Sequence, residues 1–162
     1  MMQIYNNKVI TDIDENFIKE WEDLWEVSEN ANTFNSFGWF LVTKEALKTD
    51  TYEIHACYKD HTLVAVLGLF FEKRFGITVA SSQGYKPVNT PFLMKEYDEE
   101  VFKTFFGEIT KIRNIYLAKV DQKAVDILHR LFPKMFFSLV SANPYLDRHE
   151  NPDLFLSTTN HK

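Results

Sequence analysis

The stretch from residue 63 to residue 71 decides the fold, and it runs Leu63-Val64-Ala65-Val66-Leu67-Gly68-Leu69-Phe70-Phe71. In an extended strand, successive side chains point to opposite faces of the sheet, and here both alternating sets are apolar. A strand that is apolar on both faces is typical of a central position that is covered on both sides. Gly68 interrupts the pattern and indicates a bulge or a close approach of another group to the backbone. The run is far too short to cross a bilayer as a helix.

The residues on either side of this strand predict further strands and helices. We expect a strand over residues 52–58, a polar turn over 59–62, the long strand to residue 73 and a third strand over 77–80. Apolar residues at helical spacing predict helices over 14–28, 36–48, 99–112 and 121–131. Two short strands are expected over 115–120 and 136–142. The sequence therefore predicts an α+β fold with a mixed, mainly antiparallel sheet and helices on both faces.

The composition is that of a globular protein. The chain has 162 residues, which predicts a single domain over 1–162 with a weakly patterned tail over 143–162. The single cysteine, Cys57, excludes an internal disulfide and a multi-cysteine zinc site, and it favours a reducing compartment. The start of the chain lacks the basic and apolar segments of a signal peptide, so we expect a cytoplasmic protein. The net charge of −5 argues against nucleic acid as the main ligand.

A search for catalytic groups finds no complete set, and no catalytic residue is assigned. His55 and Cys57 share one face of a predicted strand, so a Cys–His dyad is one hypothesis. A buried and inert thiol is the favoured interpretation. The histidines show no His-x-x-x-His spacing, so no metal site is expected. The sequence also contains no nucleophile elbow, no Walker loop and no dinucleotide fingerprint.

The segment 81–94 is the best candidate for a binding loop, because it is long and has no strand or helix pattern. Its apolar residues need either a core contact or a ligand to explain them. The run Ser81-Ser82-Gln83-Gly84 follows a strand, where backbone N–H groups can bind an anion. A plain exit from the strand is favoured, since no helix is predicted to start there. The aromatic residues around Trp39 are a second candidate lining, although aromatic residues at helical spacing usually belong to a core.

Several segments resemble those of a known family. They are Trp21-Glu22-Asp23-Leu24, Thr33-Phe34-Asn35-Ser36-Phe37-Gly38-Trp39, Ala65-Val66-Leu67-Gly68-Leu69-Phe70-Phe71 and Asn143-Pro144-Tyr145-Leu146-Asp147. Together they resemble the N-terminal half of the twin-GNAT acyltransferases, which include the Fem aminoacyltransferases and the CelD-like group. The resemblance implies a GNAT-like domain that helps to form the acceptor-substrate cleft. It implies these substrate-binding residues: Trp39, Ser82, Gln83, Tyr85 and Phe92.

The chain also departs from the pattern of that family. GNAT acyltransferases hold the CoA pyrophosphate on a loop of the form Arg/Gln-x-x-Gly-x-Gly/Ala, and no such string surrounds the five glycines here. The family's second half would begin about where this sequence ends, and Gly68 stands where the family has a proline. The resemblance therefore implies a lobe without its own cofactor. Acetyl-CoA or another acyl donor would bind the other half.

Three functional hypotheses remain open. The first is the acceptor-side lobe of a GNAT-type N-acyltransferase, completed by a second GNAT half or by a homodimer. Its acceptor would be a small molecule or a component of the cell envelope. The second is a non-catalytic GNAT-like binding or regulatory module. The third and least favoured is an independent hydrolase or transferase that uses Cys57 and His55.

Overall fold

A central sheet organises the computed structural model, which describes residues 4–48, 51–82, 90–117 and 119–135. Strands β2 (Tyr52–Lys59), β3 (Thr62–Arg74) and β4 (Ile77–Ser81) form an antiparallel meander. Strand β1 (Tyr5–Ile10) pairs antiparallel with β2, and β6 (Ile115–Tyr116) pairs parallel with β4. The order is β1-β2-β3-β4-β6, and the sheet is therefore mixed but mainly antiparallel, as the sequence predicted.

Strand β5 (Leu93–Met94) pairs antiparallel with the first half of β3, whereas β4 pairs with its second half. The chain thus leaves the sheet after Ser81 and returns to the same edge of β3 at Leu93. The prediction of an unstructured loop over 81–94 was therefore wrong at its C-terminal end. Leu93 pairs with Val66 and Met94 pairs with Ala65. These partners are far apart in the sequence, so a local pattern does not reveal the pairing.

Four helices and one short 3₁₀ turn, η1 (Thr33–Asn35), accompany the sheet in the described ranges. The helices are α1 (Glu15–Val27), α2 (Phe37–Leu47), α3 (Glu99–Ile109) and α4 (Gln122–Leu131). Each begins after a residue whose side chain accepts a hydrogen bond from a first-turn N–H group, a favourable N-cap. These residues are Asp14, Ser36, Asp98 and Asp121. All four predicted helices are confirmed to within a few residues at their ends.

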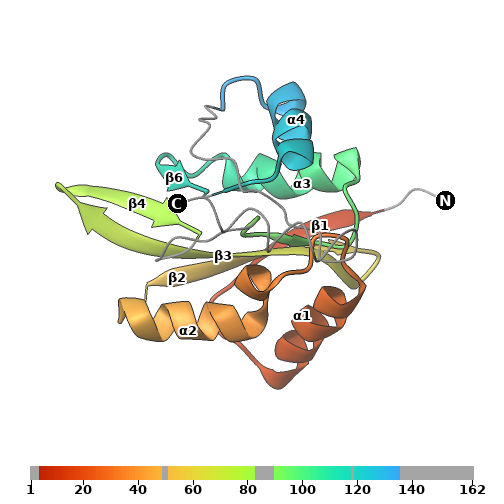
Figure 1. Cartoon of the computed structure of the whole chain (residues 1–162), viewed down its shortest axis with the longest axis horizontal. Helices are drawn as coiled ribbons and strands as arrows, with labels where there is room; N and C mark the ends of the chain where they lie inside the picture. The colour runs from red at the N-terminus through yellow and green to blue at the C-terminus, as the bar shows by residue number, and fades with distance from the viewer. Residues whose placement is uncertain (1–3, 49–50, 83–89, 118, 136–162) are drawn as a thin grey trace, which may run out of the picture.

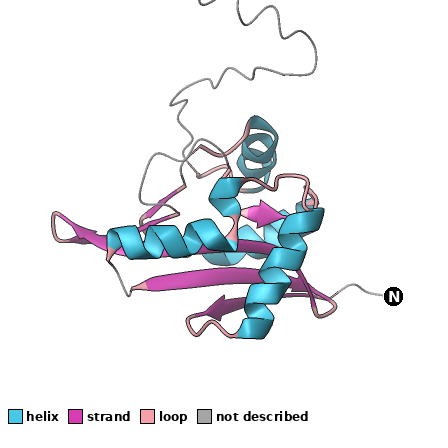
Figure 2. Cartoon of the chain, turned by 60° about the horizontal axis from the view of Figure 1, so that its bottom comes forward, coloured by secondary structure: helices cyan, strands magenta, loops and turns pink. Residues whose placement is uncertain are grey.

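The helices cover both faces of the sheet (Figures 1 and 2). Helices α1 and α2 pack on one face through Phe17, Trp21 and Phe40, whereas α3 and α4 pack on the other. Strand β3 contributes buried side chains to both clusters. The prediction that β3 is central and covered on both sides is confirmed.

The remaining strand predictions were less accurate. Strand β1 was not predicted, and the strand expected over 115–120 has only two paired residues, in β6. The strand expected over 136–142 and the tail over 143–162 lie outside the described residues.

Candidate functional site

A small hollow lies between η1, α2, the middle of β3 and the end of β4. Its free volume is about 10 Å³, which is about what one water molecule needs. Among the described residues, aromatic side chains and small polar groups dominate its wall, and no charged side chain belongs to it. The wall comprises Trp21, Phe34, Asn35, Ser36, Trp39, Phe40, Thr43, Gly68, Phe70, Ser82 and Pro91. A hollow of this size accommodates one small uncharged group, such as a carbonyl or a hydroxyl.

The sequence builds this hollow through local caps and one close contact. Ser36 caps α2 by accepting a hydrogen bond from the Trp39 N–H group at 3.1 Å, which fixes the first turn. The Trp39 ring meets the Phe34 ring edge-on, with centroids 4.9 Å apart. The Phe40 ring lies on Gly68, where an added Cβ would stand 2.5 Å from Phe40 Cδ2. The close approach predicted at Gly68 is therefore confirmed, and it forms the floor of the hollow.

The indole N–H of Trp39 has no hydrogen-bond partner in the described part of the chain, although its Nε1 atom is buried. The two other indoles are satisfied. Trp21 Nε1 donates to the Asn35 carbonyl at 3.1 Å and Trp25 Nε1 donates to the Asn32 carbonyl at 3.0 Å. A buried donor without a partner costs about 1–3 kcal/mol, and a water, an ion or a bound molecule that supplies an acceptor would remove that cost.

The other predicted substrate-binding residues have separate positions. Ser82 is buried in the wall of the hollow, and its backbone N–H donates to the Tyr116 carbonyl at 3.1 Å. Phe92 has no exposed surface and packs against Phe102 and Phe106 from α3, so its side chain belongs to the core. Gln83 and Tyr85 lie outside the described residues. The structure thus brings Trp39 and Ser82 together and separates Phe92 from them.

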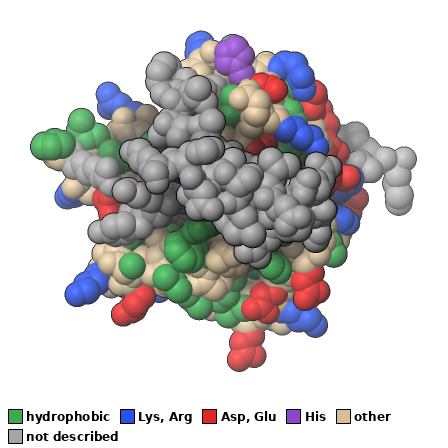
Figure 3. Space-filling view, in the orientation of Figure 1, with side chains coloured by type: hydrophobic (Ala, Val, Ile, Leu, Met, Phe, Trp, Pro, Cys, Tyr) green, Lys and Arg blue, Asp and Glu red, His purple; other side chains and the backbone are tan. Residues whose placement is uncertain are grey.

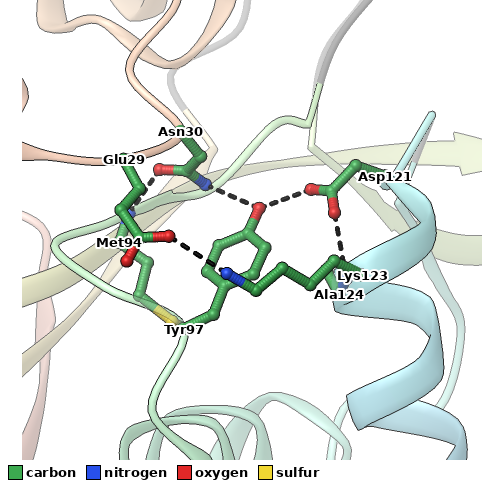
Figure 4. A network of polar contacts seen from close by, with 7 residues as sticks. All are labelled: Glu29, Asn30, Met94, Tyr97, Asp121, Lys123 and Ala124. Atoms are coloured by element: carbon green, nitrogen blue, oxygen red, sulfur yellow. Dashed lines mark hydrogen bonds and ion pairs between the residues drawn. The ribbon is translucent and has the colours of Figure 1, made fainter.

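A network of polar contacts holds the segment that leads from Thr90 into α3 (Figure 4). The Asn30 amide donates to the Phe92 carbonyl at 2.9 Å, and its oxygen accepts from the Met94 N–H group at 3.0 Å. Asp121 accepts hydrogen bonds from the Tyr97 and Thr90 hydroxyls while it caps α4. No motif in the sequence singles out Asn30. Its long-range contacts leave no local sequence signal.

Burial and the carboxylate of Asp121 raise the pKa of Tyr97 above its ordinary value. The Tyr97 hydroxyl therefore stays protonated and donates to Asp121 at neutral pH. The ammonium of Lys123 lies over the Tyr97 ring and pairs with Glu29 at 3.1 Å. These contacts join Glu29, which follows α1, to the start of α4 and to Tyr97, which precedes α3.

The N-terminus of α3 follows the return of the chain to the sheet and is rich in carboxylates. Asp98 accepts a hydrogen bond from the Glu100 N–H group at 2.8 Å, and Glu99 and Glu100 stand in the first turn. Helix N-termini favour anions because their N–H groups and dipole are positive there. Here the protein's own carboxylates stand at that end, and two of them pair with cations, Glu99 with Arg130 and Glu100 with Lys103.

A second and larger hollow, of about 310 Å³, lies between the β2–β3 turn and the start of α3, and it is lined by Lys59, Asp60, Thr62, Val64, Lys95, Glu96 and Val101. Two of its polar groups already have partners. Asp60 Oδ1 accepts from the Ile4 N–H group at 3.3 Å, and the Lys59 ammonium lies over the Tyr5 ring. We take the smaller hollow as the candidate site because Trp39, in its wall, has a buried N–H group without a described partner.

The Cys–His dyad hypothesis is wrong. Cys57 has no exposed surface, and burial raises the pKa of its thiol to about 12, so the thiolate is not available as a nucleophile. His55 is buried as well, and its Nε2 atom contacts Glu53 Oε2 at 3.2 Å rather than a cysteine.

In the described ranges, no three or more His, Cys, Asp or Glu side chains are grouped so that they could hold a metal ion. The same ranges contain no helix with the length and apolar character needed to cross a membrane.

Comparison with known proteins identifies the fold. No protein-family model and no curated protein matches the chain. Among solved structures, the chain is similar to the aminoglycoside N-acetyltransferase AAC(6')-Iy in complex with CoA. The TM-score is 0.50 at 9% sequence identity, over 91% of this chain and 97% of that one. This likeness concerns the fold alone, which is GNAT-like, as the sequence predicted.

Proposed function

We propose that this chain is the acceptor-side lobe of a GNAT-type N-acyltransferase, without its own acyl-CoA pyrophosphate loop. The observation that carries the proposal is the uncharged hollow lined by Trp39 and Ser82, together with the buried indole N–H group of Trp39, for which the described residues supply no acceptor. The donor recognises a carbonyl or hydroxyl oxygen of the acceptor, while the rings of Phe34 and Trp39 contact its apolar part.

The hollow supplies binding but not the proton transfer that acyl transfer needs. When an amine nitrogen attacks a thioester carbonyl, a C–N bond forms, the C–S bond breaks, and the amine proton passes to a base while the thiol leaves. Among the described residues, none of the side chains in the wall is a carboxylate or a histidine. In this proposal the base is supplied from outside that wall.

The acyl donor is assigned to a second GNAT half. This sequence lacks the Gly-rich pyrophosphate string, and Asp98, Glu99 and Glu100 occupy the N-terminus of α3. Both features oppose the binding of a polyanion such as acetyl-CoA. A second GNAT half would complete the enzyme and bring the donor, whereas a second copy in a homodimer would lack the same string and could add only to the acceptor side.

The acceptor site is tested by calorimetric titration of amines that differ in chemistry: an aminoglycoside, glucosamine and a short peptide with a free amino terminus. At least one should bind, and Trp39→Phe should weaken that binding about fivefold, the value of one hydrogen bond. Trp25→Phe is the matched control, because it removes an indole N–H that is already paired outside the hollow. Equal affinities for Trp39→Phe and the wild type would refute this role of Trp39.

The missing donor site is tested by thermal unfolding with acetyl-CoA. A ligand at a hundred times its Kd adds about 2.7 kcal/mol to the free energy of unfolding. We expect no shift in Tm with this chain alone. A clear, saturable shift would show that the donor binds here and would overturn this part of the proposal.

The alternative is a non-catalytic GNAT-like binding or regulatory module, which the absence of a base from the hollow also favours. The two functions differ in a reaction that contains acetyl-CoA, the bound amine and a candidate second half. Release of the CoA thiol that needs both polypeptides supports the lobe. Binding of the amine without thiol release under any pairing supports the module.

A further inference from the structure

The β3–β4 hairpin carries an exposed apolar tip that neither the core nor the hollow uses. It projects from the body of the molecule, and in Figure 3 hydrophobic side chains occupy that end. The Phe75 side chain is fully exposed, with a relative accessibility of 104%, and Ile77 is 54% exposed. Single exposed apolar residues are common, but a fully exposed phenylalanine at the end of a projecting hairpin is not.

The backbone conformation at position 75 also disfavours phenylalanine. Phe75 and Gly76 form the two-residue turn with φ values of 52° and 79°. Turns with positive φ at both central positions favour Asn, Asp or Gly, because a bulky side chain is strained there. The equivalent β2–β3 turn begins with Asp60, whose carboxylate also accepts a hydrogen bond from Ile4. Neither packing nor turn preference explains Phe75.

The charge of the tip is opposite to that of the whole chain. The end of the hairpin, residues 72–79, contains two basic residues, Lys73 and Arg74, and one acidic residue, Glu72, whereas the chain has a net charge of −5. Lys73 is exposed on β3 directly before the turn. The tip therefore combines an aromatic ring, an aliphatic side chain and local positive charge.

We propose that this hairpin tip anchors the protein reversibly to an anionic lipid surface. Phe75 and Ile77 enter the interfacial region, and the exposed Lys73 before the turn faces the anionic headgroups. A protein partner fits the tip less well, because a stable protein interface buries about 1,200 Å² or more and the apolar tip consists of two side chains. The proposal does not depend on acyl transfer.

Vesicle sedimentation with the whole protein tests this inference. Phosphatidylcholine vesicles that contain phosphatidylglycerol should pull down the wild type at low salt, and vesicles of phosphatidylcholine alone should bind it more weakly. Phe75→Asn should lower the partition coefficient about tenfold or more, while it suits the turn and preserves folding. Lys73→Gln should weaken binding to the anionic vesicles only, and added salt should do the same.

Val42→Asn is the control, since Val42 is 55% exposed on α2 away from the turn. It should bind vesicles like the wild type. The proposal is overturned if the wild type does not sediment with anionic vesicles, or if Phe75→Asn sediments equally. A third outcome also overturns it. If the wild type does not bind vesicles but self-associates in light scattering, and Phe75→Asn abolishes that self-association, the partner of the tip is a second copy of the chain.

Discussion

Gly68 shows how one residue fixes the position of a helix. The Phe40 ring of α2 lies directly on its backbone, and this contact lets α2 approach the sheet closely. Phe40 also stacks on Phe70 with centroids 5.2 Å apart, so the ring is held from several sides. The strand position therefore requires glycine for space rather than for backbone freedom.

Gly68→Ala should destabilise the protein by about 1–3 kcal/mol, because the new methyl group overpacks the Phe40 ring. Gly107→Ala is the matched control. Gly107 lies inside α3 with nothing within 4 Å of an added Cβ, so alanine should stabilise the helix by about 0.5–1 kcal/mol. Urea unfolding of both variants gives the two free energies. A neutral Gly68→Ala variant would mean that α2 can move away without loss.

His55 makes stability depend on pH. Burial lowers the pKa of His55 below 6.5, although the nearby carboxylate of Glu53 opposes this shift. The unfolded chain therefore binds more protons than the folded chain at mildly acidic pH. The stabilisation is complete above pH 6.5 and is lost as the pH falls below that value.

Urea unfolding at several pH values between 8 and 5 should show this loss, with a slope from His55 of at most about 1.4 kcal/mol per pH unit. His55→Gln keeps a polar side chain beside Glu53 but cannot titrate in this range. The variant should lose that part of the slope. An unchanged pH profile would assign the effect to other groups.

At the scale of elements, Asp121 connects the start of α4 to Thr90 and to Tyr97. Its carboxylate caps α4 through the Ala124 N–H group at 2.9 Å and accepts from Thr90 and Tyr97. Asp121 therefore holds three segments together: the start of α4, the segment at Thr90 and the residues before α3. Hydrogen bonds to a charged group are stronger than those between neutral groups.

Tyr97→Phe should destabilise the protein by about 1.5–3 kcal/mol, because Asp121 and Asn30 each lose a partner. Tyr52→Phe is the control, since the Tyr52 hydroxyl makes one exposed bond to the Thr11 carbonyl at 3.1 Å. Its expected loss is below about 1.5 kcal/mol. Hydrogen exchange at the Met94 amide should also be faster in Tyr97→Phe than in the wild type, and it should be unchanged in Tyr52→Phe. Equal losses in the two variants would argue against a coupled network.

At the scale of the whole molecule, the sheet and α3 enclose Cys57 completely. Its thiol can react only when the sheet opens, which makes it a reporter of global unfolding. Native protein should react slowly with a disulfide reagent at neutral pH, and urea should accelerate the reaction as the unfolded population rises. Thr110→Cys places a second thiol at an exposed position and should react at once. Rapid labelling of native Cys57 would contradict the packed sheet.

The sequence by itself determined the helices and the central strand. Helix periodicity and capping residues such as Ser36 and Asp121 act within a few positions along the chain, so a local pattern reveals them. The apolar character of β3 on both faces placed it at the centre. The choice of Trp39 and Ser82 as one site also began with the sequence, and the structure brings both to one hollow.

Only the tertiary structure decided the features that depend on distant partners. Strand β1 has the polar segment Tyr5-Asn6-Asn7-Lys8 and is a strand because β2 supplies the facing backbone groups. Phe92 became a core residue because β5 returns to β3 and turns its ring toward α3. The Trp39 N–H group, for which the described residues supply no acceptor, and the exposed Phe75 are likewise visible only in the folded chain. The physical reason is that hydrogen-bond satisfaction and burial are properties of the assembled molecule, not of a local sequence.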